Sequence, residues 1–320
     1  MLGMMLLLGF AMIAALGAIP TASAATTSIV DSTSCSSIGG SWAGSTCTLS
    51  TSYTNTAGNT LEVPSGTTLA IGPSGTIVND GTIQVDSGGI VMITSSSDFY
   101  GIENYGLITN AGTMNLANTA YYAIWSAGGS ITNTGAITIT TSGAFGTMAI
   151  YSIFYNGVTP TITNSGTINI QNTGSTYGIY IGFSALINTA SGKIYITNSG
   201  ELGIYNVAGT VTDNGLISSE NTGPSNYGID NNGPMTVAGT LTVGSANDAV
   251  LNQASITQEC GGVINGPGTI NGNPYIPATG CTVVPVPEFP MAGFGPLLLA
   301  LLVPALLVLS RKIRKPQPLA

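Results

Sequence analysis

The sequence predicts an all-β protein whose main part is a single-stranded parallel, right-handed β-helix solenoid. Two short motifs recur in step along residues 55–272, and each alternates apolar and polar positions as strands do. A repeat unit of 23 to 31 residues is too short to bury an apolar face alone, so successive units have to stack. A signal peptide and one C-terminal transmembrane helix are expected on either side of this solenoid.

The first motif has the pattern apolar-x-Asn-x-Gly-x-apolar-x-apolar. Close copies occupy 77–85, 108–116, 131–139 and 162–170, and looser copies surround Gly192, Gly215, Gly239 and Gly268. Successive motif glycines, from Gly81 to Gly268, are separated by 23 to 31 residues. Because Asn and Gly accept left-handed backbone angles, we expect them at tight bends between short strands.

The second motif is a large residue, then Gly or Ala, then Ile or Val. Its copies begin at Tyr100, Tyr122, Met148, Tyr177, Leu202, Tyr227 and Asp248. Stacking like motifs predicts roughly eight to ten coils about 4.8 Å apart around a column of Ile, Val and Leu. A β-propeller is the alternative, but its blades need about 40 residues or more.

The N-terminal residues 1–24 are predicted to be a signal peptide. Residues 1–18 are almost wholly apolar, and Ala22-Ser23-Ala24 has the small-x-small pattern of a cleavage site. The usual basic region is missing, so an uncleaved N-terminal anchor is the alternative. Either interpretation predicts export.

The four cysteines form two close pairs at opposite ends of the exported part. Among three connectivities, local pairing of Cys35 with Cys47 and of Cys260 with Cys281 is expected. Each bridge would contribute roughly 3 kcal/mol in the chain-entropy model. We expect residues 25–54 to form a disulfide-containing N-terminal cap, and the second bridge to close the other end.

The C-terminal residues predict a membrane anchor. A proline-rich linker at 273–290 precedes twenty uncharged residues, 291–310, which is the length that crosses a bilayer. The tail at 311–320 carries four of the five basic residues and should stay in the cytoplasm, with the acidic part outside. A buried core helix is the alternative for 291–310.

The repeats at 55–272 resemble those of exported β-helix proteins, including bacterial adhesin passenger domains and pectin-lyase-like surface proteins. The tail resembles the archaeal PEF-type sorting signal, through Pro287, Glu288, Phe289 and Pro290, the apolar span and the basic cluster. This second resemblance implies an archaeal protein, processed by an archaeosortase-like membrane protease that removes the span, with lipid attachment in its place. An ordinary permanent anchor is the alternative.

Composition excludes several classes of function. Only 6% of residues are charged, against about 25% in ordinary domains, and the net charge is −8. A basic surface for nucleic acid is therefore not expected. The absence of histidine excludes Ser-His-Asp and Cys-His catalysis and imidazole metal sites, and we expect neither a metal nor a cofactor.

Catalytic groups are sparse in the exported part. It has no arginine, a single lysine at Lys193, and carboxylates that are scattered singly. Asp213 and Asp230 could converge across neighbouring coils, but we interpret both as solvated turn residues. The sequence therefore predicts no enzyme.

The candidate ligand-binding residues are Trp125, Tyr151, Tyr180 and Tyr205. Each follows the inward Ile of the second motif and should point outward, in a column that also holds Glu103, Asp230 and Leu251. The Gly or Ala two positions earlier is expected on the same face, leaving room for the rings. Such a stripe suits sugar rings or an apolar patch of another surface protein. A purely structural ladder of rings is the alternative.

The expected function is adhesion or envelope interaction by a non-enzymatic, β-rich protein anchored to the outer face of the cell membrane. Its expected partners are the membrane, an envelope polysaccharide or another surface protein, and the processing protease. The alternatives are a polysaccharide-active lyase- or hydrolase-like enzyme and a passive structural spacer of the envelope.

Overall fold

The computed structural model describes residues 24–279 except 95–98, 118–120, 142–146, 173–176, 199, 222–226, 246–247 and 267–268. The expected apolar span, sorting motif and basic tail lie outside the described residues, as does the signal peptide up to residue 23. Within the described part of the chain, no helix is both long and apolar enough to cross a bilayer.

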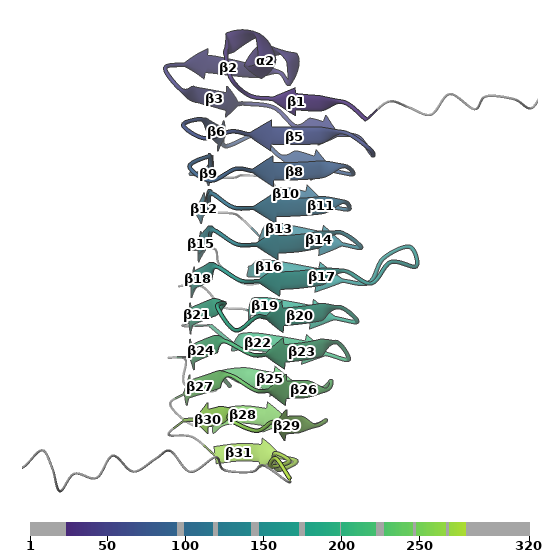
Figure 1. The fold of residues 1–320 in the computed structure, drawn as a ribbon, viewed down its shortest axis with the longest axis vertical. Coiled ribbons are helices and arrows are strands. Elements are labelled where there is room, and N and C mark those ends of the chain that lie inside the picture. Colours follow the sequence, from purple (N-terminus) through teal and green to yellow (C-terminus); the bar gives the residue numbers. More distant parts are fainter. Residues whose placement is uncertain are drawn as a thin grey trace, which may run out of the picture. The chain divides into compact units, whose positions relative to one another are not determined.

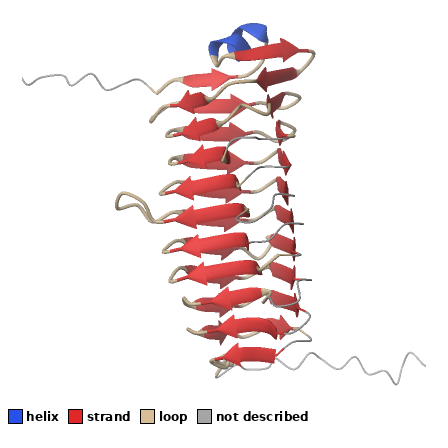
Figure 2. Ribbon diagram, turned by 180° about the vertical axis from the view of Figure 1, so that it is seen from behind, coloured by secondary structure: helices blue, strands red, loops and turns tan. Residues whose placement is uncertain are grey.

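The described chain winds through three sheets, which confirms the prediction of an all-β parallel solenoid (Figures 1 and 2). We call these sheets A, B and C, and their strands are given below. Each coil passes in order through sheets C, A and B, and strands of neighbouring coils pair in parallel. The strands of sheet A are β1 (Thr26–Ser28), β5 (Thr60–Val63), β8 (Thr82–Val85), β11 (Leu107–Asn110), β14 (Ser130–Asn133), β17 (Thr161–Asn164), β20 (Ala185–Asn188), β23 (Thr210–Asp213), β26 (Met235–Val237) and β29 (Ile256–Gln258).

The other two sheets run beside it. The strands of sheet B are β2 (Gly40–Ala43), β3 (Thr46–Leu49), β6 (Thr68–Ile71), β9 (Ile90–Ile93), β12 (Thr113–Ala117), β15 (Ala136–Thr141), β18 (Thr167–Asn172), β21 (Lys193–Asn198), β24 (Leu216–Asn221), β27 (Thr240–Ser245) and β30 (Val263–Asn265). The strands of sheet C are β4 (Tyr53–Asn55), β7 (Ile77–Asn79), β10 (Tyr100–Asn104), β13 (Tyr122–Ala127), β16 (Met148–Ile153), β19 (Tyr177–Gly182), β22 (Leu202–Val207), β25 (Ile229–Asn231), β28 (Asp248–Asn252) and β31 (Thr269–Gly272).

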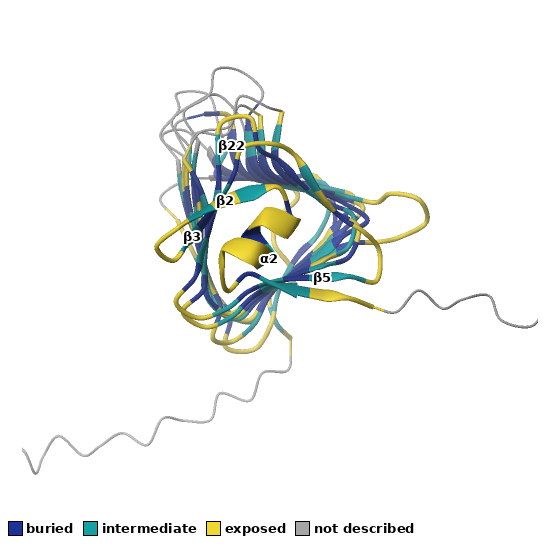
Figure 3. Ribbon diagram, turned by 90° about the horizontal axis from the view of Figure 1, so that it is seen from above, coloured by how far each residue is buried: buried dark blue, intermediate teal, exposed yellow. Residues whose placement is uncertain are grey.

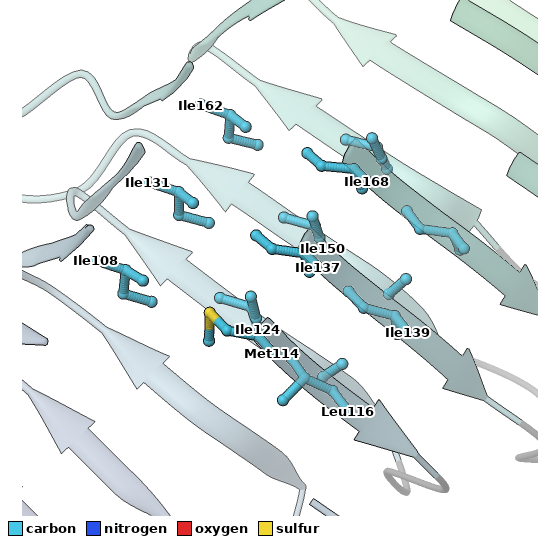
Figure 4. Packing of buried hydrophobic residues seen from close by; sticks show 14 of the residues in the cluster. Ile108, Met114, Leu116, Ile124, Ile131, Ile137, Ile139, Ile150, Ile162 and Ile168 are labelled. Carbon is cyan, nitrogen blue, oxygen red and sulfur yellow. The ribbon is translucent and has the colours of Figure 1, made fainter. Parts of the chain in front are cut away.

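The core consists of stacked aliphatic columns, as the period-two pattern predicts. Ile108, Ile131 and Ile162 lie one above another in sheet A, and each is fully buried (Figure 4). Met114 and Ile137 belong to a parallel column in sheet B. Each coil thus completes the burial of its apolar side chains against the coils on either side.

The first motif marks a corner, but it does not identify which corner. In most copies it joins a strand of sheet A to one of sheet B, whereas the copy at 77–85 joins β7 of sheet C to β8 of sheet A. Both corners use Asn and Gly in the same way, so the sequence pattern cannot distinguish them. The spacing counted from Gly81 therefore mixes two positions of the coil.

The expected role of Asn and Gly at these bends is wrong. The non-glycine residues with positive φ in the described residues are Asn156, Phe183 and Ala208, which are not motif positions. The motif Asn instead points inward and forms a buried ladder of side-chain amides. The motif Gly is required by close approach, since a Cβ on Gly135 would collide with the carbonyl oxygen of Gly112 in the coil before.

The N-terminal end of the solenoid is closed by a helix and a hairpin. Helix α2 (Ser32–Ser37) begins at Asp31, whose carboxylate accepts a hydrogen bond from the Ser34 amide at 2.8 Å, and it lies over the end of the coils (Figure 3). Cys35 of α2 forms a disulfide with Cys47 of β3, with the Cα atoms 5.5 Å apart, as predicted. Cys260 is also disulfide-bonded, and its expected partner Cys281 lies outside the described residues.

Candidate ligand-binding site

The structure places the four candidate residues at directly paired positions on the outer side of sheet C. Trp125 of β13 pairs with Tyr151 of β16, Tyr151 with Tyr180 of β19, and Tyr180 with Tyr205 of β22. Glu103 precedes them in the column, and Asp230 and Leu251 follow. The order is the one that alternation along the second motif predicts.

The rings do not form a single stack, however. The ring centroids of Tyr151 and Tyr180 are 4.6 Å apart at 35°, and those of Tyr180 and Tyr205 are 5.4 Å apart at 88°. Trp125 stacks instead on Tyr100, at 5.0 Å and 29°. All four candidate rings are half-buried, so each covers its neighbours while leaving part of its surface open.

A second aromatic column, which the sequence argument missed, lies beside the first. It consists of the residues that open the second motif, and Tyr100, Tyr122, Met148, Tyr177 and Leu202 pair in that order. The two columns interlock: the rings of Tyr122 and Tyr151 are 5.2 Å apart, as are those of Tyr177 and Tyr205. We call Tyr100, Tyr122, Trp125, Tyr151, Tyr177, Tyr180 and Tyr205 the aromatic face.

The expected position of the small residue in the second motif is wrong, and this explains the missed column. Ala123 and Ala149 are fully buried, and a Cβ on Gly178 would collide with the side chain of Ile196 in sheet B. Two successive residues, the Gly or Ala and then the Ile, therefore face the core. Strict alternation fails at this point, and the residues on both sides of the pair emerge on the outer face.

The aromatic face is flanked by acidic groups and is otherwise uncharged. Burial raises the pKa of the Glu103 carboxyl, and the nearby Asp80 carboxylate raises it further. Burial also raises the pKa of Tyr151, Tyr180 and Tyr205, so all three rings carry neutral hydroxyl groups at neutral pH. The face thus offers ring surfaces and hydroxyls rather than charge.

The corner between sheets C and A widens beside this face. The segment 154–160 between β16 and β17 projects from the coils (Figure 1). On one side of it lies a cleft of about 380 Å³ whose lining includes Asp80, Tyr105, Gly128, Tyr155 and Asn156. The ring of Tyr105 contacts Trp125 edge-on at 5.4 Å and Tyr155 at 5.7 Å, which connects this cleft to the aromatic face.

A second cleft lies on the other side of the projecting segment. It has a volume of about 540 Å³, and Phe154, Thr159, Phe183 and Ala208 are among its lining residues. Phe183 and Phe154 are 63% and 48% exposed, which is unusual for phenylalanine. The sequence signal for both clefts was the longer interval between the motif glycines Gly135 and Gly166, together with Asn156-Gly157 inside it.

Backbone strain is concentrated at the same corner. Asn156, Phe183 and Ala208 have φ values of 50°, 52° and 57°, in the left-handed region. For a bulky residue such as Phe183 this conformation is a real outlier, and such residues collect at functional sites.

The two carboxylates considered as a catalytic pair are not brought together. Asp213 lies on β23 of sheet A, where it is fully buried, so its interpretation as a solvated turn residue is wrong. Its Oδ1 ends the internal amide ladder, accepting from Asn188 at 2.8 Å, and burial raises the pKa of its carboxyl group. Asp230 belongs to sheet C, in the outer column beside Tyr205.

No family model, curated protein or solved structure matches this chain. The candidate site therefore has to be interpreted from its own geometry.

Proposed function

We propose that this protein is a non-enzymatic recognition protein of the cell surface, whose aromatic face binds a polysaccharide in adhesion or envelope interaction. The observation that carries the proposal is the two interlocked columns of rings on the outer side of sheet C. The ring contacts within and between these columns have centroid distances of 4.6 to 6.3 Å.

The chemistry of the face suits a sugar polymer better than an apolar protein patch. The C–H groups on the face of a sugar ring pack against the electron-rich faces of aromatic rings. Tyrosine hydroxyls beside those faces supply hydrogen bonds to sugar hydroxyls. A linear polysaccharide along the column would meet a ring in every coil from β10 to β22, because parallel strands repeat about every 4.8 Å.

The test is binding of the full-length protein, purified in detergent, to a panel of envelope polysaccharides by isothermal titration calorimetry. The variant Tyr151→Ala/Tyr180→Ala/Tyr205→Ala is expected to lose at least about tenfold in affinity. Tyr195→Ala is the matched control, because Tyr195 is a partly exposed tyrosine on the outer side of sheet B.

A second triple variant separates recognition from structural support. Leucine at positions 151, 180 and 205 keeps apolar cover over the sheet but removes the ring faces. Lost binding in a leucine variant that melts like the wild type supports recognition. Retained binding in the leucine variant overturns the proposal, because the ring faces are then not the site. No saturable binding by the intact protein also overturns it and favours a passive spacer.

We also propose that the protein is exported and anchored through residues 287–315. The support is the sequence of the sorting motif, the uncharged span and the basic cluster. In the native host, a C-terminal tag should disappear from the membrane-bound protein, and Glu288→Ala should retain it. A tag that persists on the wild-type protein indicates a permanent anchor.

A further inference from the structure

The cleft of about 380 Å³ at the corner between sheets C and A combines aromatic rings with unneutralised acids. Tyr105 and Tyr155 contribute the rings, and Asp80 contributes an exposed carboxylate. Glu103 is adjacent, because its carboxylate accepts a hydrogen bond from the Tyr105 hydroxyl at 3.5 Å. One carboxylate, Asp80, therefore lines the cleft together with two tyrosines, and a second carboxylate, Glu103 of the next coil, contacts one of these tyrosines from beside it.

No basic residue of the solenoid balances these charges at the cleft. Lys193 is the single basic residue within 24–279, and its side chain is exposed at the start of β21 in sheet B. The two carboxylates lie instead in sheet C and at the corner that follows it, where Asp80 comes between β7 and β8. Electrostatic attraction to these carboxylates would therefore favour a ligand group that carries a positive charge.

We propose that this cleft binds an organic ammonium group, carried by an amino sugar of the polysaccharide that lies on the aromatic face. An ammonium group is attracted by its charge both to aromatic ring faces within about 6 Å and to carboxylates, an attraction that a neutral sugar lacks and that an anion reverses. The edge contact between Tyr105 and Trp125 makes the cleft continuous with the face. The inference rests on the proposed function in taking a saccharide, rather than a lysine side chain, as the carrier.

The test compares two ligands with the same sugar backbone, one with charged amines and one in which acetylation makes the nitrogens neutral. Full-length protein is titrated with a glucosamine tetramer and with the corresponding N-acetylglucosamine tetramer, whose nitrogen is neutral. We expect the free amine to bind about tenfold more tightly at low salt, and the preference to shrink at high salt because exposed charges are screened.

Two isosteric variants locate the effect. Asp80→Asn and Glu103→Gln each remove one charge and are expected to reduce the preference for the free amine about three- to tenfold. Glu62→Gln is the matched control, because Glu62 lies on β5 of sheet A and its loss changes the net charge equally. Equal affinity for the two tetramers overturns the inference, and so does an equal effect of Glu62→Gln.

Further arms exclude other roles of the cleft. Tighter binding of a lysine peptide than of the glucosamine tetramer would overturn the inference in favour of a protein partner. Release of reducing ends from the tetramer would overturn it in favour of hydrolysis by the two carboxylates.

The outcomes for the cleft and for the aromatic face can be told apart. If only the aromatic face is functional, both tetramers bind equally and both lose affinity in the Tyr151/Tyr180/Tyr205 alanine variant. If only the cleft is functional, glucosamine monomer binds, the alanine variant leaves its affinity unchanged, and Asp80→Asn reduces it.

Discussion

Two corners of the coil, the one between sheets A and B and the one between sheets C and A, are both closed by a ladder of side-chain amides. Only the ladder between sheets A and B continues through the central coils. At the first corner the amide ladder runs from Asn110 through Asn133, Asn164 and Asn188 to Asp213, with links of 2.7 to 2.9 Å. Each link spans one coil, so the corner has the same geometry from β11 to β23.

The corner between sheets C and A begins in the same way but does not continue. Asn55, Asn79 and Asn104 form a ladder that ends on Ser126, and a new ladder starts at Asn206. Between them the paired positions are Ser152 and Ile181. These two coils carry the projecting segment and the strained residues Asn156 and Phe183, whereas Ala208 follows Asn206 in the coil where the new ladder starts.

The projecting segment begins where the ladder is interrupted, whereas Asp80 and Tyr105, which also line the first cleft, directly follow the ladder residues Asn79 and Asn104. Where the amide is replaced, the corner opens and accepts Tyr155, Phe183 and the clefts beside them. The regular coils with an unbroken ladder therefore stabilise the solenoid, and the irregular coils contribute to the clefts that are available for recognition.

The largest effect is expected at a glycine of the regular corner. Gly135→Ala places a Cβ against the Gly112 carbonyl, and backbone atoms cannot move aside, so the free energy of unfolding should fall by about 3 kcal/mol or more. Thermal unfolding measures this. Gly244→Ala is the control, because its Cβ would meet nothing closer than 3.5 Å, and an equal loss there would contradict the packing argument.

A slightly smaller effect is expected when the ladder is interrupted. Asn164→Ala removes the amide that accepts from Asn133 and donates to Asn188 and to the Lys193 carbonyl, which leaves buried groups unpaired. The free energy of unfolding should fall by about 2–3 kcal/mol. Ser152→Ala at the open corner should change it little, because the buried Ser152 hydroxyl makes no hydrogen bond. Similar losses in both variants would show that the two corners do not differ.

Asp213→Asn should stabilise the protein, by about 1 kcal/mol at neutral pH. Oδ2 of Asp213 has no hydrogen-bond partner. In the coil before, the side-chain amide of Asn188 donates to the Leu216 carbonyl. Thr240 pairs with Leu216, so the Thr240 carbonyl is the equivalent acceptor for position 213. An amide at 213 could donate to that carbonyl and continue the ladder.

The same variant has a defined pH dependence. The pKa of Asp213 is raised in the folded state above 3.8, so the wild-type protein loses stability as pH rises from 3.8 through the raised pKa. Asp213→Asn lacks this loss, and its advantage should therefore grow over that interval in denaturant titrations. An advantage that is the same at pH 3 and pH 7 would contradict burial of the carboxyl group.

Relief of strain at the open corner is expected to have an effect no larger than that of Asp213→Asn. Phe183→Gly removes a bulky residue from the left-handed region and should raise the free energy of unfolding by about 1 kcal/mol. Ala208→Gly should do the same by a smaller amount. A clear loss of stability in Phe183→Gly would mean that its exposed ring packs more tightly than its 63% exposure indicates.

Sequence patterns predicted the features that depend on repetition alone. Alternation placed Ile102 and Ile124 in the core and Trp125 and Tyr151 outside, because a pleated strand allows no other arrangement. It failed at Ala123, where two successive residues of β13 face inward. It also missed the clefts, since their shape depends on how residues from four coils, such as Asp80 and Tyr155, meet in space.

The Asn and Gly corners also bear on how such a chain changes over evolutionary time. Every coil closed by these residues has the same Asn amide for hydrogen bonding and the same close approach of Gly to a backbone carbonyl. Each such coil therefore fits equally well above or below any other. A whole coil can therefore be duplicated or deleted at a regular corner without altering its neighbours, each event changing the length of the solenoid by about 4.8 Å. The open corner has no such freedom, because Ser152 and Ile181 fit only the order of coils in which they lie.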